Sequence, residues 1–235
     1  MIQMNRATTA APSNFALQST PKHVAIIMDG NRRWARAQNL PPAEGHRQGV
    51  ETLVTLLPAF TDSSVEVLTL FAFSSANWRR QDTEVTNLMR LADQALRRLT
   101  PMCCEKGISV EVIGRDDRVP HTLRRRLQQT QQATAQGTRQ LRIALDYSSR
   151  DQILAAARRV GKDCDMHTFT QALCPAGDVD LLIRTGKEQR LSDFLLWECA
   201  FAELYFPDVY WPDFTVENLR AAIAWYRQRN RRYGV

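Results

Sequence analysis

An acid, a glycine and two arginines follow the first apolar run of the chain, in the stretch HVAIIMDGNRRWA that begins at His23. The residues before Asp29 are rich in β-branched side chains and predict a short buried strand. Gly30 favours a turn, and a helix that begins near Arg32 and Arg33 would add unpaired backbone N–H groups to their guanidinium donors. A carboxylate among phosphate-binding groups indicates a divalent cation, since Mg²⁺ commonly takes one or two carboxylates plus substrate oxygens. From the pattern alone, Asp29 can equally be an N-capping residue.

A second cationic group follows the apolar run VDLLIR, which predicts a strand from Val179 to Arg184. This group could hold a diphosphate through Arg184, Arg190 and the hydroxyl of Ser192. A helix that begins near Ser192 would add backbone donors. The Gly186-Lys187 pair is not a Walker loop, because the spaced glycine before it and the Ser or Thr after it are absent.

Polar residues also follow the strand predicted for Val65–Phe73. By pattern this exit is either a functional loop or a surface loop with one packed Trp. His46 stands near the start of a predicted helix that ends or kinks at Pro58, and a lone His more often packs or caps than takes part in catalysis. The candidate functional residues at the end of this strand are Ser74, Ser75, Asn77, Trp78 and Arg80.

The remaining pattern alternates helices with strands. A long amphipathic helix is predicted from Asp82 to Glu105, and its apolar stripe is core packing by default. Such alternation predicts an α/β fold, with one mostly parallel sheet flanked by helices and its sites at the carboxyl ends of the strands. The other predicted elements are strands at 108–114 and 141–147 and helices at 120–136, 148–160 and 215–229, with Asp116-Asp117 in a turn.

Composition limits the class of protein. The 235 residues, 44% hydrophobic, suit one large α/β domain, with residues 1–20 as a flexible tail and 21–235 as the domain. The net charge of +6 favours anionic partners, but we find no aromatic-studded basic surface for nucleic acid. Five cysteines without paired CxxC spacing, and no segment suited to a signal peptide or membrane span, predict a reduced cytoplasmic protein.

Three separated stretches closely resemble the signatures of the cis-prenyltransferases, the undecaprenyl diphosphate synthase family, over Lys22–Gly234. These are HVAIIMDGNRRWA, the polar exit around Asn77 and Trp78, and RTGKEQRLSDF, which is similar to the family's RTGGExRxSNF. The resemblance implies a Mg²⁺-dependent isoprenyl transferase that condenses isopentenyl diphosphate with an allylic diphosphate such as farnesyl or geranyl diphosphate. The implied product is a Z-configured prenyl or polyprenyl diphosphate, held in a hydrophobic tunnel to which Ala72 and Ala92 could give room.

The resemblance also implies a role for each matching residue. Asp29 is the metal-binding catalytic acid, Asn77 also acts in catalysis, and Glu203 helps hold Mg²⁺. The implied allylic diphosphate site comprises Gly30, Asn31, Arg32, Arg33, His46 and Arg80, and the isopentenyl diphosphate site Arg184, Arg190 and Ser192. Trp34, Ser74, Ser75 and Trp78 would contact substrate through the loop. A homodimer, whose Arg232-Tyr233-Gly234 tail reaches the neighbouring subunit, and peripheral membrane association through the lipid product are further implied.

Departures from the family pattern leave the product open. Pro42 stands where an Arg is common, Ala76 where an acid is usual, and Gln81 where Pro is frequent. Lys187 replaces a Gly, Gln189 a His, and Ser148-Ser149 a Gly pair. A short-chain or irregular, lavandulyl-type synthase is therefore the nearest alternative. A non-catalytic partner subunit is another, although such relatives typically lose the acid that Asp29 supplies.

Overall fold

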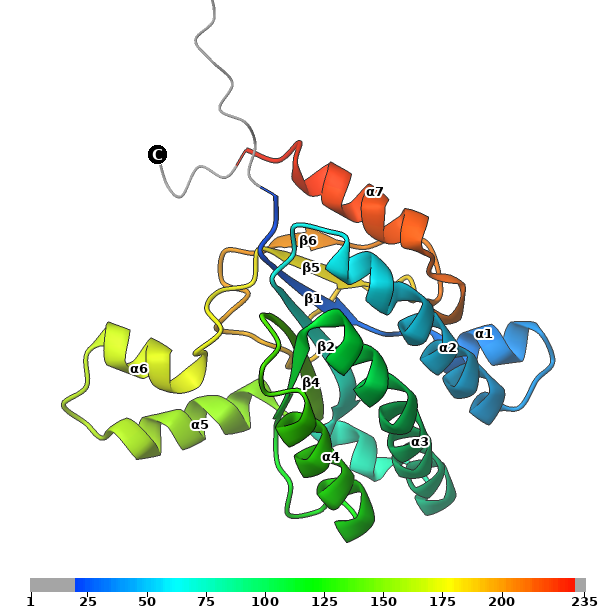
Figure 1. The fold of residues 1–235 in the computed structure, drawn as a ribbon, viewed down its shortest axis with the longest axis horizontal. Coiled ribbons are helices and arrows are strands. Elements are labelled where there is room, and N and C mark those ends of the chain that lie inside the picture. Colours follow the sequence, from blue (N-terminus) through cyan, green and yellow to red (C-terminus); the bar gives the residue numbers. More distant parts are fainter. Residues whose placement is uncertain (1–19, 231–235) are drawn as a thin grey trace, which may run out of the picture.

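Six parallel strands form one sheet in the computed structural model, which describes residues 20–230 (Figure 1). Their order across the sheet is β3-β4-β2-β1-β5-β6, so the two predicted site strands, β1 and β5, are neighbours. The strands are β1 (His23–Ile27), β2 (Val67–Ser74), β3 (Ile108–Ile113), β4 (Arg139–Tyr147), β5 (Leu181–Arg184) and β6 (Glu203–Tyr205).

The helices are α1 (Asn31–Ala37), α2 (Pro42–Thr61), α3 (Asp82–Lys106), α4 (His121–Ala133), α5 (Ser149–Val160), α6 (Met166–Leu173) and α7 (Val216–Tyr226). Two short 3₁₀ helices, Ser75–Arg79 and Trp211–Asp213, complete the elements of the described chain. The predicted single-domain α/β fold with a parallel sheet is confirmed. None of the helices within residues 20–230 has the length and apolar character needed to span a bilayer.

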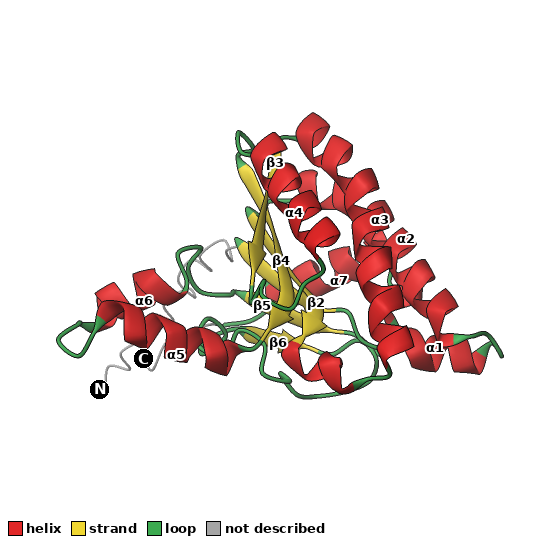
Figure 2. Cartoon of the chain, turned by 90° about the horizontal axis from the view of Figure 1, so that it is seen from below, coloured by secondary structure: helices red, strands yellow, loops and turns green. Residues whose placement is uncertain are grey.

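Helices cover the two faces of the sheet unequally. Apolar residues of α2, α3, α4 and α7 join the larger core on one face, while a smaller core on the other face is completed by the segment around Phe194 and Leu195. In Figure 2, α1 to α4 lie on one side of the sheet, and the α5–α6 hairpin extends away on the other. Strands buried on both faces explain why β1 and β5 read as unbroken apolar runs.

Local sequence signals account for several helix ends. Asp82 and Glu84 stand in the first turn of α3, where carboxylates suit the helix dipole, and the helix ends at left-handed Gly107. The Oγ of Ser148 accepts a hydrogen bond from the Asp151 N–H, which caps α5 as predicted. Pro58 lies inside α2, which continues to Thr61.

The predicted helix near Ser192 is wrong. Residues 192–200 form turns, and Ser192, Asp193 and Leu195 have φ angles of 53°, 63° and 46°. Such angles are left-handed and cannot belong to a right-handed helix. The prediction also missed α6 and β6, and α7 ends at Tyr226 rather than Arg229.

The predicted N-terminal tail lies outside the described residues, apart from residue 20, and so does the Arg232-Tyr233-Gly234 ending. The turn predicted for Asp116-Asp117 is confirmed, since the chain turns between β3 and α4 there.

Candidate active site

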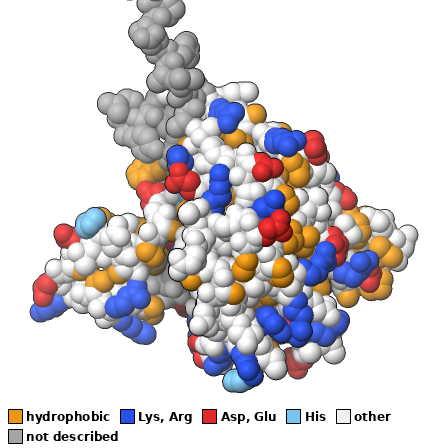
Figure 3. Space-filling view, viewed as in Figure 1, with side chains coloured by type: hydrophobic (Ala, Val, Ile, Leu, Met, Phe, Trp, Pro, Cys, Tyr) orange, Lys and Arg blue, Asp and Glu red, His pale blue; other side chains and the backbone are white. Residues whose placement is uncertain are grey.

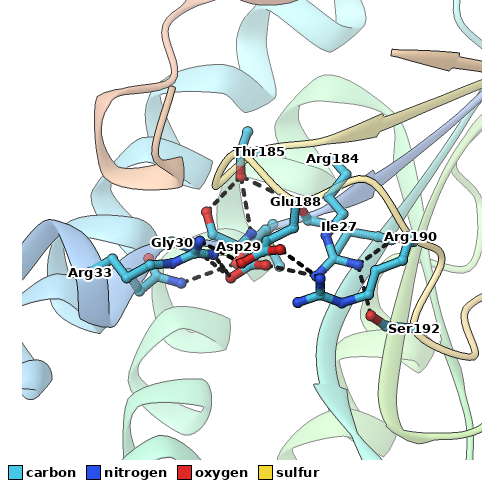
Figure 4. A network of polar contacts seen from close by, with 11 residues as sticks. Ile27, Asp29, Gly30, Arg33, Arg184, Thr185, Glu188, Arg190 and Ser192 are labelled. Atoms are coloured by element: carbon cyan, nitrogen blue, oxygen red, sulfur yellow. Dashed lines mark hydrogen bonds and ion pairs between the residues drawn. The ribbon is translucent and has the colours of Figure 1, made fainter. Parts of the chain in front are cut away.

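The ends of β1 and β5 bring Asp29 and Arg184 together. Ile27 pairs with Arg184 in the parallel register, so Asp29 stands just beyond the neighbouring strand end. Asp29 Oδ2 lies 2.8 Å from Arg184 Nη2, and Asp29 Oδ1 lies 3.0 Å from Arg33 Nη2 at the start of α1 (Figure 4). Asp29 therefore contacts one arginine from each predicted diphosphate site.

The backbone around Asp29 is held in place by close contacts. Thr185 Oγ1 accepts a hydrogen bond from the Asp29 N–H at 3.0 Å and donates one to the Asp29 carbonyl at 2.8 Å. Gly30 has a φ of 105°, and a Cβ there would come within 2.6 Å of the Tyr210 ring. A glycine is therefore required at the turn from β1 into α1, both by conformation and by space.

Two opposing effects determine the charge of Asp29. Burial alone would raise its pKa, but hydrogen bonds and charge from Arg184 and Arg33 outweigh this and hold the pKa below its usual value. The Gly30 N–H also donates to Asp29 Oδ1 at 2.6 Å. Asp29 is thus an anion at neutral pH, as a ligand for a divalent cation must be.

Arg184 is the buried centre of the second cluster, with 5% of its side chain exposed. Its Nη1 donates to Ser192 Oγ at 2.7 Å and to the carbonyl of Arg190. The structure thus joins the three residues predicted to bind isopentenyl diphosphate. It does so through a loop rather than a helix.

The carboxylate of Asp193 holds that loop in its non-helical path. It accepts hydrogen bonds from Ser148 Oγ at 2.6 Å and from the Arg150 N–H at 3.2 Å, at the start of α5. The backbone carbonyl of Asp193 also accepts from the Ser149 N–H at 3.0 Å. These tertiary contacts stabilise left-handed backbone at Ser192 and Asp193.

A polar cavity of about 660 Å³ adjoins Asp29. It contains the whole group that the family resemblance implies for the allylic diphosphate, and it adds Arg36, which the prediction missed. Arg36 lies four residues after Arg32 on α1, so helical spacing was the available signal. The lining residues are Met28, Asp29, Gly30, Asn31, Arg32, Arg33, Arg36, His46 and Arg80.

His46 is neutral in this setting. The pKa of His46 is lowered to about 4, chiefly by burial and also by the positive charge of Arg80, which outweighs the opposing effect of Glu84. Arg80 Nη1 lies 2.9 Å from Glu84 Oε1, and Arg32 Nη1 lies 3.8 Å from Glu84 Oε2. His46 can therefore donate an N–H to an anion but brings no charge at pH 7.

The predicted loop is a 3₁₀ helix that caps itself. The Ser74 N–H donates to Asn77 Oδ1 at 3.1 Å, and Ser74 Oγ accepts from the Ala76 N–H at 3.2 Å. A cavity of about 1040 Å³ is lined by Ser74 and Asn77 together with residues of both diphosphate sites, including Asp29, Arg80, Arg184 and Ser192.

Three other predicted residues, Trp34, Ser75 and Trp78, do not line the cavities that contain Asp29. Ser75 Oγ donates to buried Asp146 at 3.1 Å, and Trp78 packs edge-on against Phe73 with ring centroids 5.3 Å apart. Trp34 Nε1 donates to Asp213 Oδ1 at 2.7 Å. These contacts support the loop and α1.

Glu203 is not brought to Asp29 within the described chain. It begins β6 and pairs with Leu181, at the amino end of β5, whereas Arg184 stands at the other end. Its Oε2 lies 3.2 Å from Arg229 Nε. Within residues 20–230, no three His, Cys, Asp or Glu side chains form a group suited to a metal.

An apolar cavity of about 840 Å³ continues from the polar one, between the sheet and helices α2 and α3. Met28, Asn31 and His46 line both cavities, so charged and apolar surfaces meet at these residues. Its apolar lining includes Leu53, Phe71, Ala72, Leu88, Leu91, Ala92, Ala95, Leu96, Leu99 and Leu127. The pair of cavities suits an amphiphile with an anionic head and a hydrocarbon tail.

Two departures from the family pattern have a structural account. Pro42 begins α2, a position that suits its fixed φ and missing N–H. Lys187 has a φ of 65°, and its Nζ lies 2.8 Å from Asp208 Oδ1 and 5.5 Å from the centroid of the Tyr210 ring. Nothing in the structure explains Ala76 or Gln189.

Known proteins similar to this chain are prenyltransferases. A model of the Prenyltransf family, described as "Putative undecaprenyl diphosphate synthase", matches residues 27–234. A ditrans,polycis-undecaprenyl-diphosphate synthase of Pseudomonas putida is 43% identical over 98% of this chain and 95% of its own. An isoprenyl transferase of Zymomonas mobilis is 41% identical over 97% of each chain.

Two solved structures share the fold. Lavandulyl diphosphate synthase from Lavandula x intermedia, in complex with dimethylallyl diphosphate, has a TM-score of 0.88 and 33% identity, covering 92% of this chain and 99% of its own. A "probable undecaprenyl diphosphate synthase" from Campylobacter jejuni has a TM-score of 0.80 and 31% identity, covering 92% and 100%. The chain therefore belongs to the undecaprenyl diphosphate synthase family of prenyltransferases.

Proposed function

We propose that this enzyme condenses isopentenyl diphosphate with an allylic diphosphate, such as farnesyl or geranyl diphosphate, and releases diphosphate. The observation that carries the proposal is the position of Asp29, which contacts Arg33 of one cationic cluster and Arg184 of the other. Two diphosphates bound at these clusters would meet at Asp29. The adjoining apolar cavity would receive the prenyl chain.

The residues of the polar cavity suit the departure of a diphosphate. Arg32, Arg33 and Arg80 offer charged N–H donors, and neutral His46 offers one more. The allylic carbon–oxygen bond would break with its electron pair on the departing diphosphate, so these donors would strengthen as charge develops.

The second cluster orients the nucleophile. Arg184, Arg190 and Ser192 would hold the isopentenyl diphosphate so that its double bond faces the allylic carbon. The electrons of that double bond form the new carbon–carbon bond. The adjacent carbon then loses a proton, which the departing diphosphate would accept, and a Z double bond forms. Asn77, which lines the cavity shared by both clusters, is the proposed catalytic residue of the loop.

Asp29 also suits Mg²⁺. Its carboxylate is ionised and lies in a cavity of phosphate-binding side chains, which matches the mixed carboxylate and phosphate ligands that Mg²⁺ prefers. The ion would neutralise charge on the diphosphate. Glu203 could join such a site only across a subunit boundary, because within one chain it lies at the far end of the sheet.

A homodimer belongs to the same proposal. Leu154 on α5, Met166 on α6 and Leu204 on β6 are 50%, 68% and 38% exposed. Leu204 lies on the edge strand β6, and Figure 3 shows further apolar side chains exposed on the α5–α6 hairpin; both features favour association. We further propose a cytoplasmic location with peripheral membrane association through the lipid product. Sedimentation analysis and vesicle flotation with and without substrates measure these two properties.

An irregular, lavandulyl-type coupling is the second candidate. The structural similarity to lavandulyl diphosphate synthase favours it. Both candidates use the same site, but they differ in the nucleophile, which is isopentenyl diphosphate in the first and a second allylic diphosphate in the irregular coupling.

The deciding experiment incubates the protein and Mg²⁺ with labelled isopentenyl diphosphate and primers from dimethylallyl to geranylgeranyl diphosphate. Linear products that grow by isopentenyl units are expected, and product length and branching are read by chromatography and mass spectrometry. A branched product from dimethylallyl diphosphate would select the second candidate. Absence of any coupled product with every primer, whether labelled or branched, would contradict both and indicate a partner subunit.

A further inference from the structure

Glu188 contacts an arginine of each diphosphate site. It lies in the loop that follows β5, where Glu188 Oε1 is 2.9 Å from Arg33 Nη1 and Glu188 Oε2 is 2.5 Å from Arg190 Nη1. Figure 4 shows its carboxylate between the two guanidinium groups. Each oxygen of one carboxylate therefore serves a different substrate site.

The contacts form a continuous row of alternating charges. Arg184 contacts Asp29, Asp29 contacts Arg33, Arg33 contacts Glu188, and Glu188 contacts Arg190. A diphosphate that binds Arg33 or Arg190 must compete with Glu188 for the same N–H donors. The two sites thus share one competing anion.

We propose that Glu188 is a shared counter-ion that couples the two diphosphate sites. The first diphosphate to bind displaces Glu188 into solvent, and the second then meets arginines that are already released. The inference rests on the proposed function and adds a positioning residue that sets how strongly one substrate favours the other.

The two carboxylates in the row differ in freedom. Asp29 is held by the Gly30 N–H and by buried Arg184, whose side chain is 5% exposed. The side chains of Glu188 and Arg190 are 31% and 60% exposed. Ion pairs at such exposure are weak, because water replaces them readily. Glu188 is therefore the member that can leave.

Displacement has a signature that a fixed charge lacks. A fixed carboxylate would weaken each ligand equally, whether or not the other is bound, and would leave the coupling factor unchanged. A displaced carboxylate weakens only the first ligand to bind, so it contributes to the coupling factor. Thermodynamic linkage requires that factor to be the same for both ligands.

The test is isothermal titration with two probes in Mg²⁺ buffer. The probes are isopentenyl diphosphate and farnesyl S-thiolodiphosphate, whose carbon–sulfur bond resists ionisation, so both can be present without turnover. In the wild-type protein, each probe should increase the affinity of the protein for the other probe. In Glu188→Gln each probe alone should bind about two- to fivefold more tightly, and the coupling factor should fall correspondingly.

Two further variants separate geometry from charge. Glu188→Asp keeps the charge, but the Asp side chain is one methylene shorter and cannot contact both Arg33 and Arg190. This variant should therefore also lower the coupling factor. Asp93→Asn is the matched control, because Asp93 bridges Arg97 at 3.0 Å and Arg126 at 3.1 Å outside the cavities that contain Asp29. It should leave both affinities and their coupling unchanged.

The outcomes separate this inference from the proposed function. An unchanged coupling factor in Glu188→Gln, or weaker binding of both probes, overturns the role of Glu188 while wild-type incorporation of isopentenyl units upholds the enzyme. A wild-type protein that binds neither probe and incorporates nothing overturns both.

Discussion

Asp29 Oδ2 lies 2.8 Å from Arg184 Nη2, although 155 positions separate the two residues in the chain. The pair exists because β1 and β5 are adjacent parallel strands whose carboxyl ends coincide. It joins the two cationic clusters on which the proposed chemistry depends.

Asp29→Asn should abolish most turnover without unfolding the protein. The amide keeps the size of the side chain but removes the charge, and loss of one preorganised electrostatic group commonly lowers kcat about a hundred- to a thousandfold. Circular dichroism and thermal unfolding should show the wild-type fold. Wild-type rates of isopentenyl incorporation in this variant would falsify the role of Asp29.

The Arg118–Asp146 ion pair should support the catalytic loop. Asp146 is fully buried, accepts two hydrogen bonds from Arg118 and one from Ser75, and the Arg118 guanidinium lies 5.3 Å from the centroid of the Trp78 ring. Asp146→Ala removes the hydrogen bonds to Ser75 and Arg118, but the Arg118 side chain is 37% exposed and can be solvated, so the variant should cost about 1–2 kcal/mol of unfolding free energy and lower kcat. Denaturant unfolding and steady-state kinetics measure the two effects.

A neighbouring pair supplies the control for that experiment. Asp117 pairs with Arg115 at 2.7 Å but is exposed. Asp117→Asn should leave stability and kcat at wild-type values. Equal losses in the two variants would mean that burial of Asp146 is irrelevant.

Ala92→Phe should shorten the product. Ala92 lines the apolar cavity on α3, and a phenyl ring there would occupy space that the growing chain needs. Mass spectrometry should detect fewer isoprene units with the rate of the first condensation retained. Ala221→Phe on the exposed side of α7 is the control. Products of wild-type length from Ala92→Phe would contradict the assignment of this cavity.

Acid should destabilise the fold through His23. Burial lowers the pKa of His23 to about 4. Its Nδ1 lies 3.1 Å from the Asp178 carbonyl, so Nδ1 carries the proton, and Nε2 accepts from Thr69 Oγ1 at 2.8 Å. The Thr69 hydroxyl can donate or accept, so burial and the positive charge of Arg142 are what favour the neutral ring over the imidazolium.

The direction of the pH effect follows from proton counting. Between pH 6.5 and 5 the unfolded chain binds a proton at His23 that the folded protein does not, so stability falls as the pH falls, by about 2 kcal/mol. Burial of His46 adds to the loss in the same range. Denaturant unfolding at pH 7 and pH 5 should give a loss of stability larger than the His23 contribution alone, and His23→Gln should reduce that loss. An unchanged slope in the variant would exclude His23.

Local sequence determined much of this protein. Apolar runs ending at Asp29 and Arg184 specified two buried strands, because strands covered on both faces need continuous hydrophobic side chains. The residues that follow specified the polar turns and the phosphate-binding side chains. The confirmed fold and family both follow from these short-range patterns.

Tertiary structure alone decided which of these groups meet. Contacts with α5 hold the Ser192–Asp193 turn in left-handed backbone, which overrode the local preference for a helix. The three-residue strand β6 is too short to leave a periodic signal. Glu188 became a bridge only because α1 and the loop after β5 face each other across the sheet end, a long-range packing that no local pattern records.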